Sequence, residues 1–167
     1  MTQEASSRLA QAAQLLKEEL NARLSEDADF AERERLMHKL ANSMVQQVQR
    51  EDLQAIADDF ESAMVVGNGQ TYRRFKEGTV RYHGLSGPLE VRRWLYRQTG
   101  VRNGPTVVPL ELRAGLMERT TPALGEALMR GTADTHSREL HRHLELAQRV
   151  PPSRTAMEHN TSTLAAA

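Results

Sequence analysis

Apolar residues recur every three or four positions through the first third of the chain. This spacing predicts three amphipathic helices, from about Ser6 to Leu24, from Asp27 or Asp29 to about Val48, and from Glu51 to about Met64. The expected inward-facing residues are Leu9, Ala12, Leu16, Leu20 and Leu24, then Phe30, Leu36, Leu40, Met44 and Val48, and finally Leu53, Ile56, Ala57, Phe60 and Met64. Core packing is the preferred interpretation, and a coiled-coil seam through Leu9, Leu16 and Leu20 is the alternative.

The period changes from helical to alternating between Thr79 and Arg97. Two alternating runs flank the Leu-Ser-Gly-Pro sequence at residues 85–88, which predicts a β-hairpin. On one side of the second run lie Leu89, Val91 and Leu95, and on the other lie Glu90, Arg92, Trp94 and Tyr96. A two-stranded ribbon buries too little to be stable alone, so the flanking helices are expected to pack on one of its faces.

Turn and cap signals divide the rest of the chain. A turn is expected at Val65–Gly69, a loop at Gly100–Pro109, and one helical turn or an extended segment at Leu110–Met117. Helices are predicted after Thr120-Thr121-Pro122, from Thr135 to Gln148, and from Arg154 to about Leu164 with Ser153 as its cap. Their inward residues would be Leu124, Leu128, Met129, Leu140, Leu144 and Ala147.

These elements predict a mainly α fold. It would be a helical bundle with one central β-hairpin and a C-terminal helix-turn-helix-like pair. The expected regions are an acidic helical region, 1–66, and a region at 67–167 that holds the basic hairpin and the C-terminal helices.

Charge is distributed unevenly along the 167 residues, although the formal net charge is zero. Residues 1–64 contain thirteen acidic and seven basic residues, a balance of −6. The hairpin and its flanks have eight basic residues against two acidic ones, a balance of +6. A polyanionic partner would therefore bind the middle of the chain. The absence of cysteine excludes disulfides and thiolate sites and suits a reducing cytoplasm, and no apolar run is long enough to cross a membrane.

The basic residues of the hairpin region are the first candidate site. Arginine binds phosphates and guanine edges through paired hydrogen bonds, and a two-stranded ribbon fits a DNA groove. A solvated sheet face with scattered arginines is the alternative. The candidate DNA-binding residues are Arg73, Arg74, Lys76, Arg81, Arg92, Arg93, Arg97 and Arg102.

The two C-terminal helices are the second candidate site. A short joint at residues 149–153 would set them at an angle, as in helix-turn-helix proteins whose second helix enters the major groove. Helix pairs of this kind are also common in proteins that bind no DNA. The outward polar set would be Arg149, Arg154, Thr155, His159 and Asn160.

Catalytic and metal-binding patterns are the third consideration. His136, His141 and His143 lack the spacing of a zinc site and are interpreted as surface residues. The sequence contains neither a phosphate-binding GxxxxGK[ST] loop nor a GxSxG elbow, and its carboxylates lie on amphipathic helices. No catalytic residue, metal or cofactor is therefore predicted.

From residue 71 to about residue 159 the chain resembles bacterial insertion-sequence transposases of the Kra-like group. The matching motifs, in order, are Ser86-Gly87-Pro88, Arg93-Trp94-Leu95-Tyr96, Pro109-Leu110-Glu111 and Val150-Pro151-Pro152-Ser153-Arg154-Thr155. Many relatives have a cysteine-rich zinc knuckle near the ribbon, which this chain lacks. The family's RNase H-like catalytic domain would begin after the last matched helix, so its acidic triad has no counterpart here.

The resemblance implies a non-catalytic region that binds transposon ends and assists assembly in transposition. Its expected partner is double-stranded DNA, with a possible homodimer through the N-terminal helices and no membrane contact. A helical protein-interaction or oligomerisation module that binds no nucleic acid is the alternative, because the acidic helices could neutralise the arginines of the hairpin.

Overall fold

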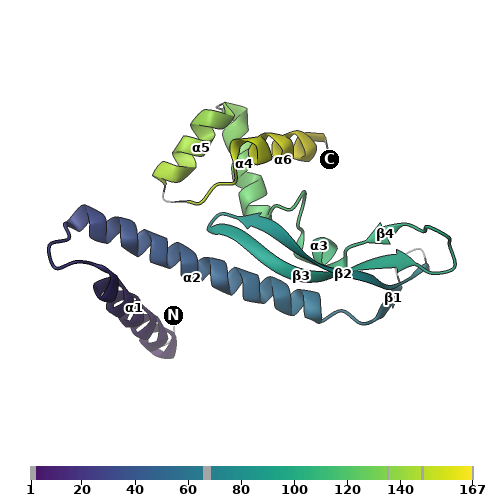
Figure 1. Ribbon diagram of the computed structural model, residues 1–167, viewed down its shortest axis with the longest axis horizontal. Helices are drawn as coiled ribbons and strands as arrows, with labels where there is room; N and C mark the ends of the chain where they lie inside the picture. Colours follow the sequence, from purple (N-terminus) through teal and green to yellow (C-terminus); the bar gives the residue numbers. More distant parts are fainter. Residues whose placement is uncertain (1–2, 66–68, 135, 148, 167) are drawn as a thin grey trace. The chain divides into compact units, whose positions relative to one another are not determined.

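A computed structural model describes residues 3–65, 69–134, 136–147 and 149–166 (Figure 1). The helices in these ranges are α1 (Gln3–Arg23), α2 (Phe30–Asp58), α3 (Pro109–Ala114), α4 (Pro122–Asp134), α5 (Ser137–Leu146) and α6 (Arg154–Ala166). The strands are β1 (Ala63–Val65), β2 (Thr71–Gly84), β3 (Gly87–Gln98) and β4 (Thr106–Val107). Among these helices, none combines the length and the apolar character that crossing a bilayer requires.

The expected mainly α fold with a single hairpin is wrong. The structure has 56% helix and 21% strand, and its strands form one four-stranded antiparallel sheet, so the protein is mixed α/β. The predicted hairpin is present, but it extends to Thr71–Gln98. Two further strands, β1 and β4, pair with its outer edges, in the order β1-β2-β3-β4. Strands of three and two residues are too short to show an alternating pattern.

The chain divides into two compact units, residues 1–45 and 46–167, and the division falls within α2. The second and third predicted helices are one continuous helix, so the expected break before Glu51 is wrong. No glycine or proline lies between Phe30 and Asp58, and an acidic pair alone does not end a helix. Asp29 precedes this helix as predicted: the Glu32 amide donates to its carboxylate at 2.7 Å.

The first unit buries few apolar side chains. Leu40 alone is buried among residues 7–45. The expectation that Leu9, Phe30, Met44 and Val48 face inward is wrong, because their side chains are 64%, 76%, 47% and 56% exposed. Helical spacing shows which residues share a face, but it does not show whether another element covers that face.

The hairpin turn is formed by Leu85 and Ser86 between the paired residues Gly84 and Gly87. Gly87 has a φ of +127°, which side-chain-bearing residues rarely adopt. From the turn the register runs through Val80–Val91 and Gly78–Arg93. A β-bulge at Phe75 then shifts it, so that Arg73 lies opposite Arg97. The predicted turn at Val65–Gly69 lies largely outside the described residues, at 66–68.

The core of the second unit lies between the hairpin, the C-terminal half of α2 and α3. It contains Leu53, Ala57, Tyr82, Leu89, Val91, Leu110 and Leu116, all buried. The inward positions predicted at Leu53, Ile56, Ala57 and Phe60 are therefore confirmed. Glutamines of α2 also bind the free edge of β3: Gln54 exchanges two hydrogen bonds with the Arg92 backbone, at 2.9 and 3.1 Å, and Gln46 donates to the Pro88 carbonyl.

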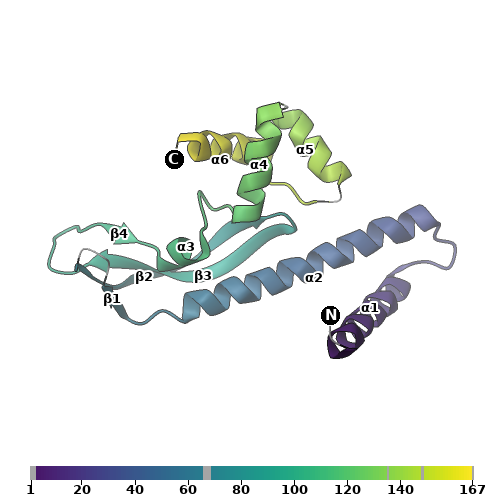
Figure 2. The same ribbon diagram turned by 180° about the vertical axis from the view of Figure 1, so that it is seen from behind.

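Helices α4, α5 and α6 pack together beside the hairpin turn (Figures 1 and 2). Their core contains Leu124, Leu128, Leu140 and Met157, and Leu144 packs against it. Four predicted positions are therefore confirmed, whereas Met129 and Ala147 are exposed. Gly131 is required at the crossing of α4 and α5, because a Cβ there would lie 2.2 Å from Leu140. The predicted cap is confirmed: the Ala156 amide donates to the Ser153 hydroxyl at 3.3 Å.

Candidate nucleic-acid interface

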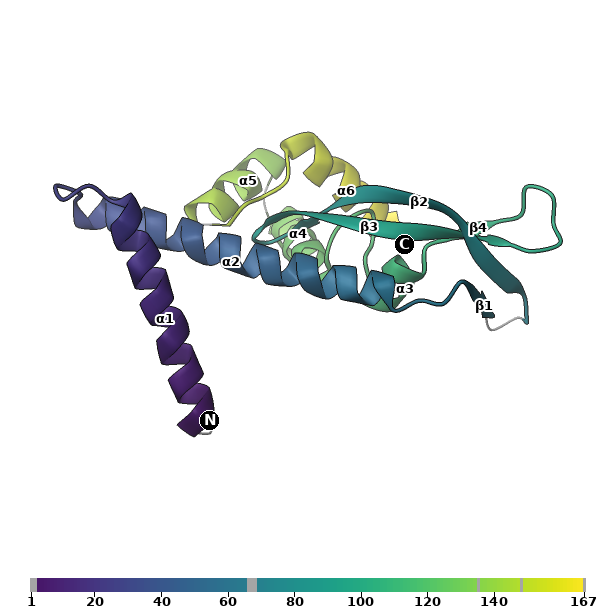
Figure 3. The same ribbon diagram turned by 60° about the horizontal axis from the view of Figure 1, so that its bottom comes forward.

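The basic residues of the hairpin form two groups along its length. We call residues 77–94 the turn half, and residues 69–76 and 95–107 the open half. Figure 3 shows the turn half beside α4 and the open half at the β1 and β4 end. The turn half contains three arginines and two glutamates, whereas the open half contains four arginines, one lysine and no carboxylate.

Every arginine of the turn half faces a carboxylate. Arg81 pairs with Glu90 at 2.6 Å, and both side chains are more than half exposed. Arg92 lies 3.4 Å from Glu77 and 3.8 Å from Asp58 of α2. These pairs leave little net positive charge on this half, which agrees with the solvated-face interpretation for Arg81 and Arg92.

Arg93 is directed into the protein, and its side chain is 12% exposed. Its Nε lies 3.5 Å from the Glu111 carboxylate of α3, which also accepts a 2.8 Å hydrogen bond from the Tyr82 hydroxyl. Burial first, and the Glu111 carboxylate next, raise the pKa of Tyr82 well above its usual value, so the phenol stays protonated and donates. Arg93 is thus a structural residue whose side chain is largely shielded from solvent.

The open half brings two arginines together without a counter-charge. Arg73 and Arg97 are direct cross-strand partners, flanked by Ala63 on β1 and Thr106 on β4. Like charges in this position destabilise a sheet unless an anion lies between them. The guanidinium of Arg97 stacks on the Phe75 ring at 3.4 Å from its centroid, and Phe75 is 50% exposed. Its Nε is buried without a hydrogen-bond partner among the described residues.

The other basic residues of the open half differ in exposure. Arg73, Lys76 and Arg102 are exposed and form no ion pair with a described residue. Arg74 is directed inward: it donates to the Phe60 carbonyl and to the Tyr96 hydroxyl at 3.2 Å, and lies 5.2 Å from the Trp94 ring centroid. Arg73, Lys76 and Arg102 are therefore the exposed cations of the open half, and the half-buried Arg97 lies beside Arg73.

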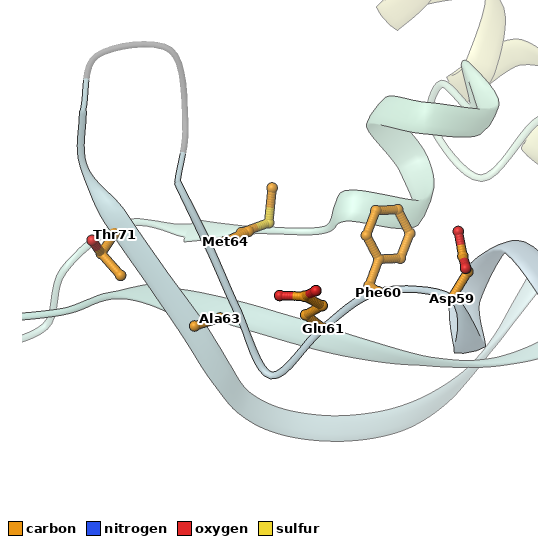
Figure 4. Close-up of a pocket in the computed structure, with 6 residues that line it drawn as sticks. All are labelled: Asp59, Phe60, Glu61, Ala63, Met64 and Thr71. Carbon is orange, nitrogen blue, oxygen red and sulfur yellow. The ribbon is translucent and has the colours of Figure 1, made fainter.

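A pocket of about 430 Å³ opens next to this surface (Figure 4). It is lined by Asp59, Phe60, Glu61, Ala63, Met64 and Thr71. The Asp59 carboxylate is paired with Arg113 at 2.6 Å. With Glu61 as its other charged residue, the pocket repels anions, so a phosphate would bind on the Arg73 and Arg97 face and not in the pocket.

The second candidate site lies at the start of α6. Arg149, Arg154, Thr155 and His159 are all exposed, as expected for an outward polar set. Asn160 is instead 4% exposed and donates to the Thr120 hydroxyl at 2.6 Å, so it holds α6 in place. The three predicted surface histidines, His136, His141 and His143, lie on or beside α5, and no group of three potential metal ligands gathers within the described ranges.

A strained turn at Glu118–Arg119 is the feature that sequence reasoning missed. Two backbone hydrogen bonds close it, from Met117 to Thr120 at 3.1 Å and from Thr120 to Met117 at 2.8 Å. Glu118 and Arg119 have φ values of +47° and +62°, the conformation that favours Asn-Gly. A residue with a side chain costs about 1 kcal/mol at each such position. Nothing in the sequence marks this turn, because Glu and Arg are not turn formers.

No protein-family model matches this chain, and neither a curated protein nor a solved structure matches it significantly. The geometry and charge of the described residues are therefore the basis of the functional proposal, beside the motif order of the sequence.

Proposed function

We propose that this chain is a non-catalytic, double-stranded-DNA-binding region of a transposase, which contacts phosphates through the open half of the hairpin and the start of α6. The observation that carries the proposal is the direct pairing of Arg73 with Arg97 in the open half, whose own residues include no carboxylate. A phosphate between the two guanidinium groups would remove their repulsion. The order of the Kra-like motifs supports the choice of DNA as the polyanion.

The two surfaces have the forms that DNA contacts use. A two-stranded ribbon can lie in the major groove, and a capped helix start can approach the backbone or the bases. Arg154 is the first residue of α6, directly after its Ser153 cap. The stack of Arg97 on Phe75 fixes one guanidinium without using its charge.

Fluorescence anisotropy with the full chain and a 20-base-pair duplex tests the proposal. Contacts to four to six phosphates give a plot of log affinity against log salt with a slope of about −4 to −5. Salt-independent binding, or no binding at low salt, would contradict the proposal. Tighter binding of an RNA of equal length would reassign the partner.

Self-association through the first unit is a second candidate function. Phe30, Met37 and Met44 are seven residues apart and are 76%, 40% and 47% exposed. Seven-residue spacing is typical of helices that pair with helices, and a second copy of the same unit offers the same stripe. The scarcity of burial in residues 7–45 favours such a partner.

Replacing Met37 and Met44 by glutamate is expected to convert a dimer into a monomer in sedimentation velocity. Both side chains are exposed, so the helix itself should remain folded by circular dichroism. Lys39→Glu, also exposed on α2, changes the net charge by the same −2 and should leave the dimer intact. A monomeric wild-type protein at micromolar concentration would exclude this candidate.

A further inference from the structure

The Glu118–Arg119 turn is fixed from two directions, although its backbone is strained. On the hairpin side, the His83 amide donates to the Arg119 carbonyl at 2.7 Å, and the Thr121 amide donates to the His83 carbonyl at 2.9 Å. On the other side, Asn160 of α6 holds Thr120, and both residues are buried. Strain that surrounding contacts maintain is common at functional sites.

The fixed turn exposes a cation that no described residue neutralises. Arg119 is exposed and forms no ion pair within the described ranges, whereas Glu118 lies 4.0 Å from His159. Burial first, and then Arg81 and Arg119, lower the pKa of His83, which indicates a positive potential around this turn. The adjacent Glu118 is 45% exposed and its carboxylate lies near His159, whereas Glu90 on β3 is paired with Arg81.

The Glu118–Arg119 turn and the open half of the hairpin lie near opposite ends of β2. Thr120 bridges to His83, near one end of β2, and Arg73 lies near the other end. Ten residues of strand span about 33 Å at about 3.3 Å per residue. This length is close to one turn of B-DNA, about 34 Å, after which the same face of the duplex presents a phosphate again.

We propose that the Glu118–Arg119 turn holds a phosphate of the same duplex that the open half of the hairpin contacts, one helical turn away. The guanidinium of Arg119 provides the contact, and the strained backbone fixes the direction of the side chain. This inference rests on the proposed DNA binding and adds a second contact point and a minimum duplex length to it.

The test compares Arg119→Gln with the wild-type full chain on two DNAs, a 20-base-pair duplex and a hairpin oligonucleotide with an 8-base-pair stem. On the long duplex, the variant should lose about five- to tenfold in affinity, and its salt slope should fall by about one. On the short stem, which cannot reach both points, its affinity should match that of the wild type. Arg119→Lys keeps the charge and should restore most of the binding.

A second variant separates strain from binding. Glu118→Asn with Arg119→Gly suits the turn, so its Tm should rise by about 2–5 °C while its affinity for the long duplex falls as in Arg119→Gln. Equal losses on both DNAs, or unchanged binding of the long duplex, would overturn the inference. If the wild-type protein shows no salt-dependent DNA binding, the proposed function is wrong. That outcome is distinct from the two outcomes that overturn only the role of Arg119.

Discussion

Replacing Arg73 and Lys76 by glutamine will lower the affinity for a 20-base-pair duplex about thirtyfold. Both side chains are exposed in the open half, where no strand or loop residue provides a carboxylate. Losing two phosphate contacts at about 1 kcal/mol each gives this factor, and the salt slope should become shallower by about two. Anisotropy titrations between 50 and 200 mM salt measure both quantities.

The matched control is Arg81→Gln with Arg92→Gln in the turn half. This control also removes two positive charges from the hairpin, but each of its two arginines already faces a carboxylate. Its affinity should fall less than about threefold at 150 mM salt, because the charge of each arginine is already offset by a carboxylate. Equal losses in the two pairs would mean that total charge, and not the open half, determines binding. No loss in either pair would exclude the hairpin as the interface.

The contrast between the Arg73/Lys76 pair and the Arg81/Arg92 pair distinguishes the two hypotheses that the sequence left open, DNA binding and a protein-interaction module that binds no nucleic acid. A module whose arginines only neutralise its own acidic helices would have every arginine paired. That arrangement occurs for Arg92 with Asp58 and for Arg113 with Asp59, both at the end of α2. It does not extend to Arg73, Lys76 or Arg102 among the described residues, so these three hairpin cations remain available to a polyanion.

Local signals predicted the features that neighbouring residues determine. The hairpin follows from alternation and a Gly-Pro turn. The helix starts at Asp29 and Ser153 follow from cap chemistry, and the start of α4 follows from Pro122 in its first turn. Alternation also placed Leu89 and Val91 on the buried face. The same alternation places Arg93 between Val91 and Leu95, so its inward direction was readable from the sequence.

Features that depend on distant residues were not predictable in this way. The edge contacts of Gln46 and Gln54 join positions about 40 residues apart, and nothing in a helix sequence marks them. The pairing of β1 and β4 depends on the hairpin that they flank. Which hairpin arginines are neutralised depends in part on Asp58 and Glu111. Asp58 belongs to the helix before the hairpin and Glu111 to a helix after it.

Glu111→Ala is expected to lower the free energy of unfolding by about 3 kcal/mol, the largest stability effect that we predict. It leaves the largely buried guanidinium of Arg93 without a counter-charge and the buried phenol of Tyr82 without an acceptor. Breaking a buried pair from one side typically costs about 3–5 kcal/mol, and the partial exposure of Glu111 places this case at the lower end. Urea denaturation followed by circular dichroism measures the change.

Glu90→Ala is the control, because it also removes a glutamate from an arginine. Its pair with Arg81 is more than half exposed on both sides, so its loss should cost less than about 1 kcal/mol. Adding Arg93→Met to Glu111→Ala should recover part of the stability, since an apolar side chain needs no counter-charge. A Glu111→Ala protein as stable as Glu90→Ala would show that Arg93 is solvated in solution.

Below its lowered Tm, the Glu111→Ala protein should bind DNA with wild-type affinity. The opposite behaviour is expected of Arg73→Gln with Lys76→Gln, which should unfold at the wild-type urea concentration and bind weakly. Two arginines on β3 explain the difference: Arg93 is enclosed by α3 and stabilises the sheet, whereas Arg97 lies on the open half beside Arg73. If both variants lost binding and stability together, the hairpin would be one cooperative structure and its arginines would not have separate roles.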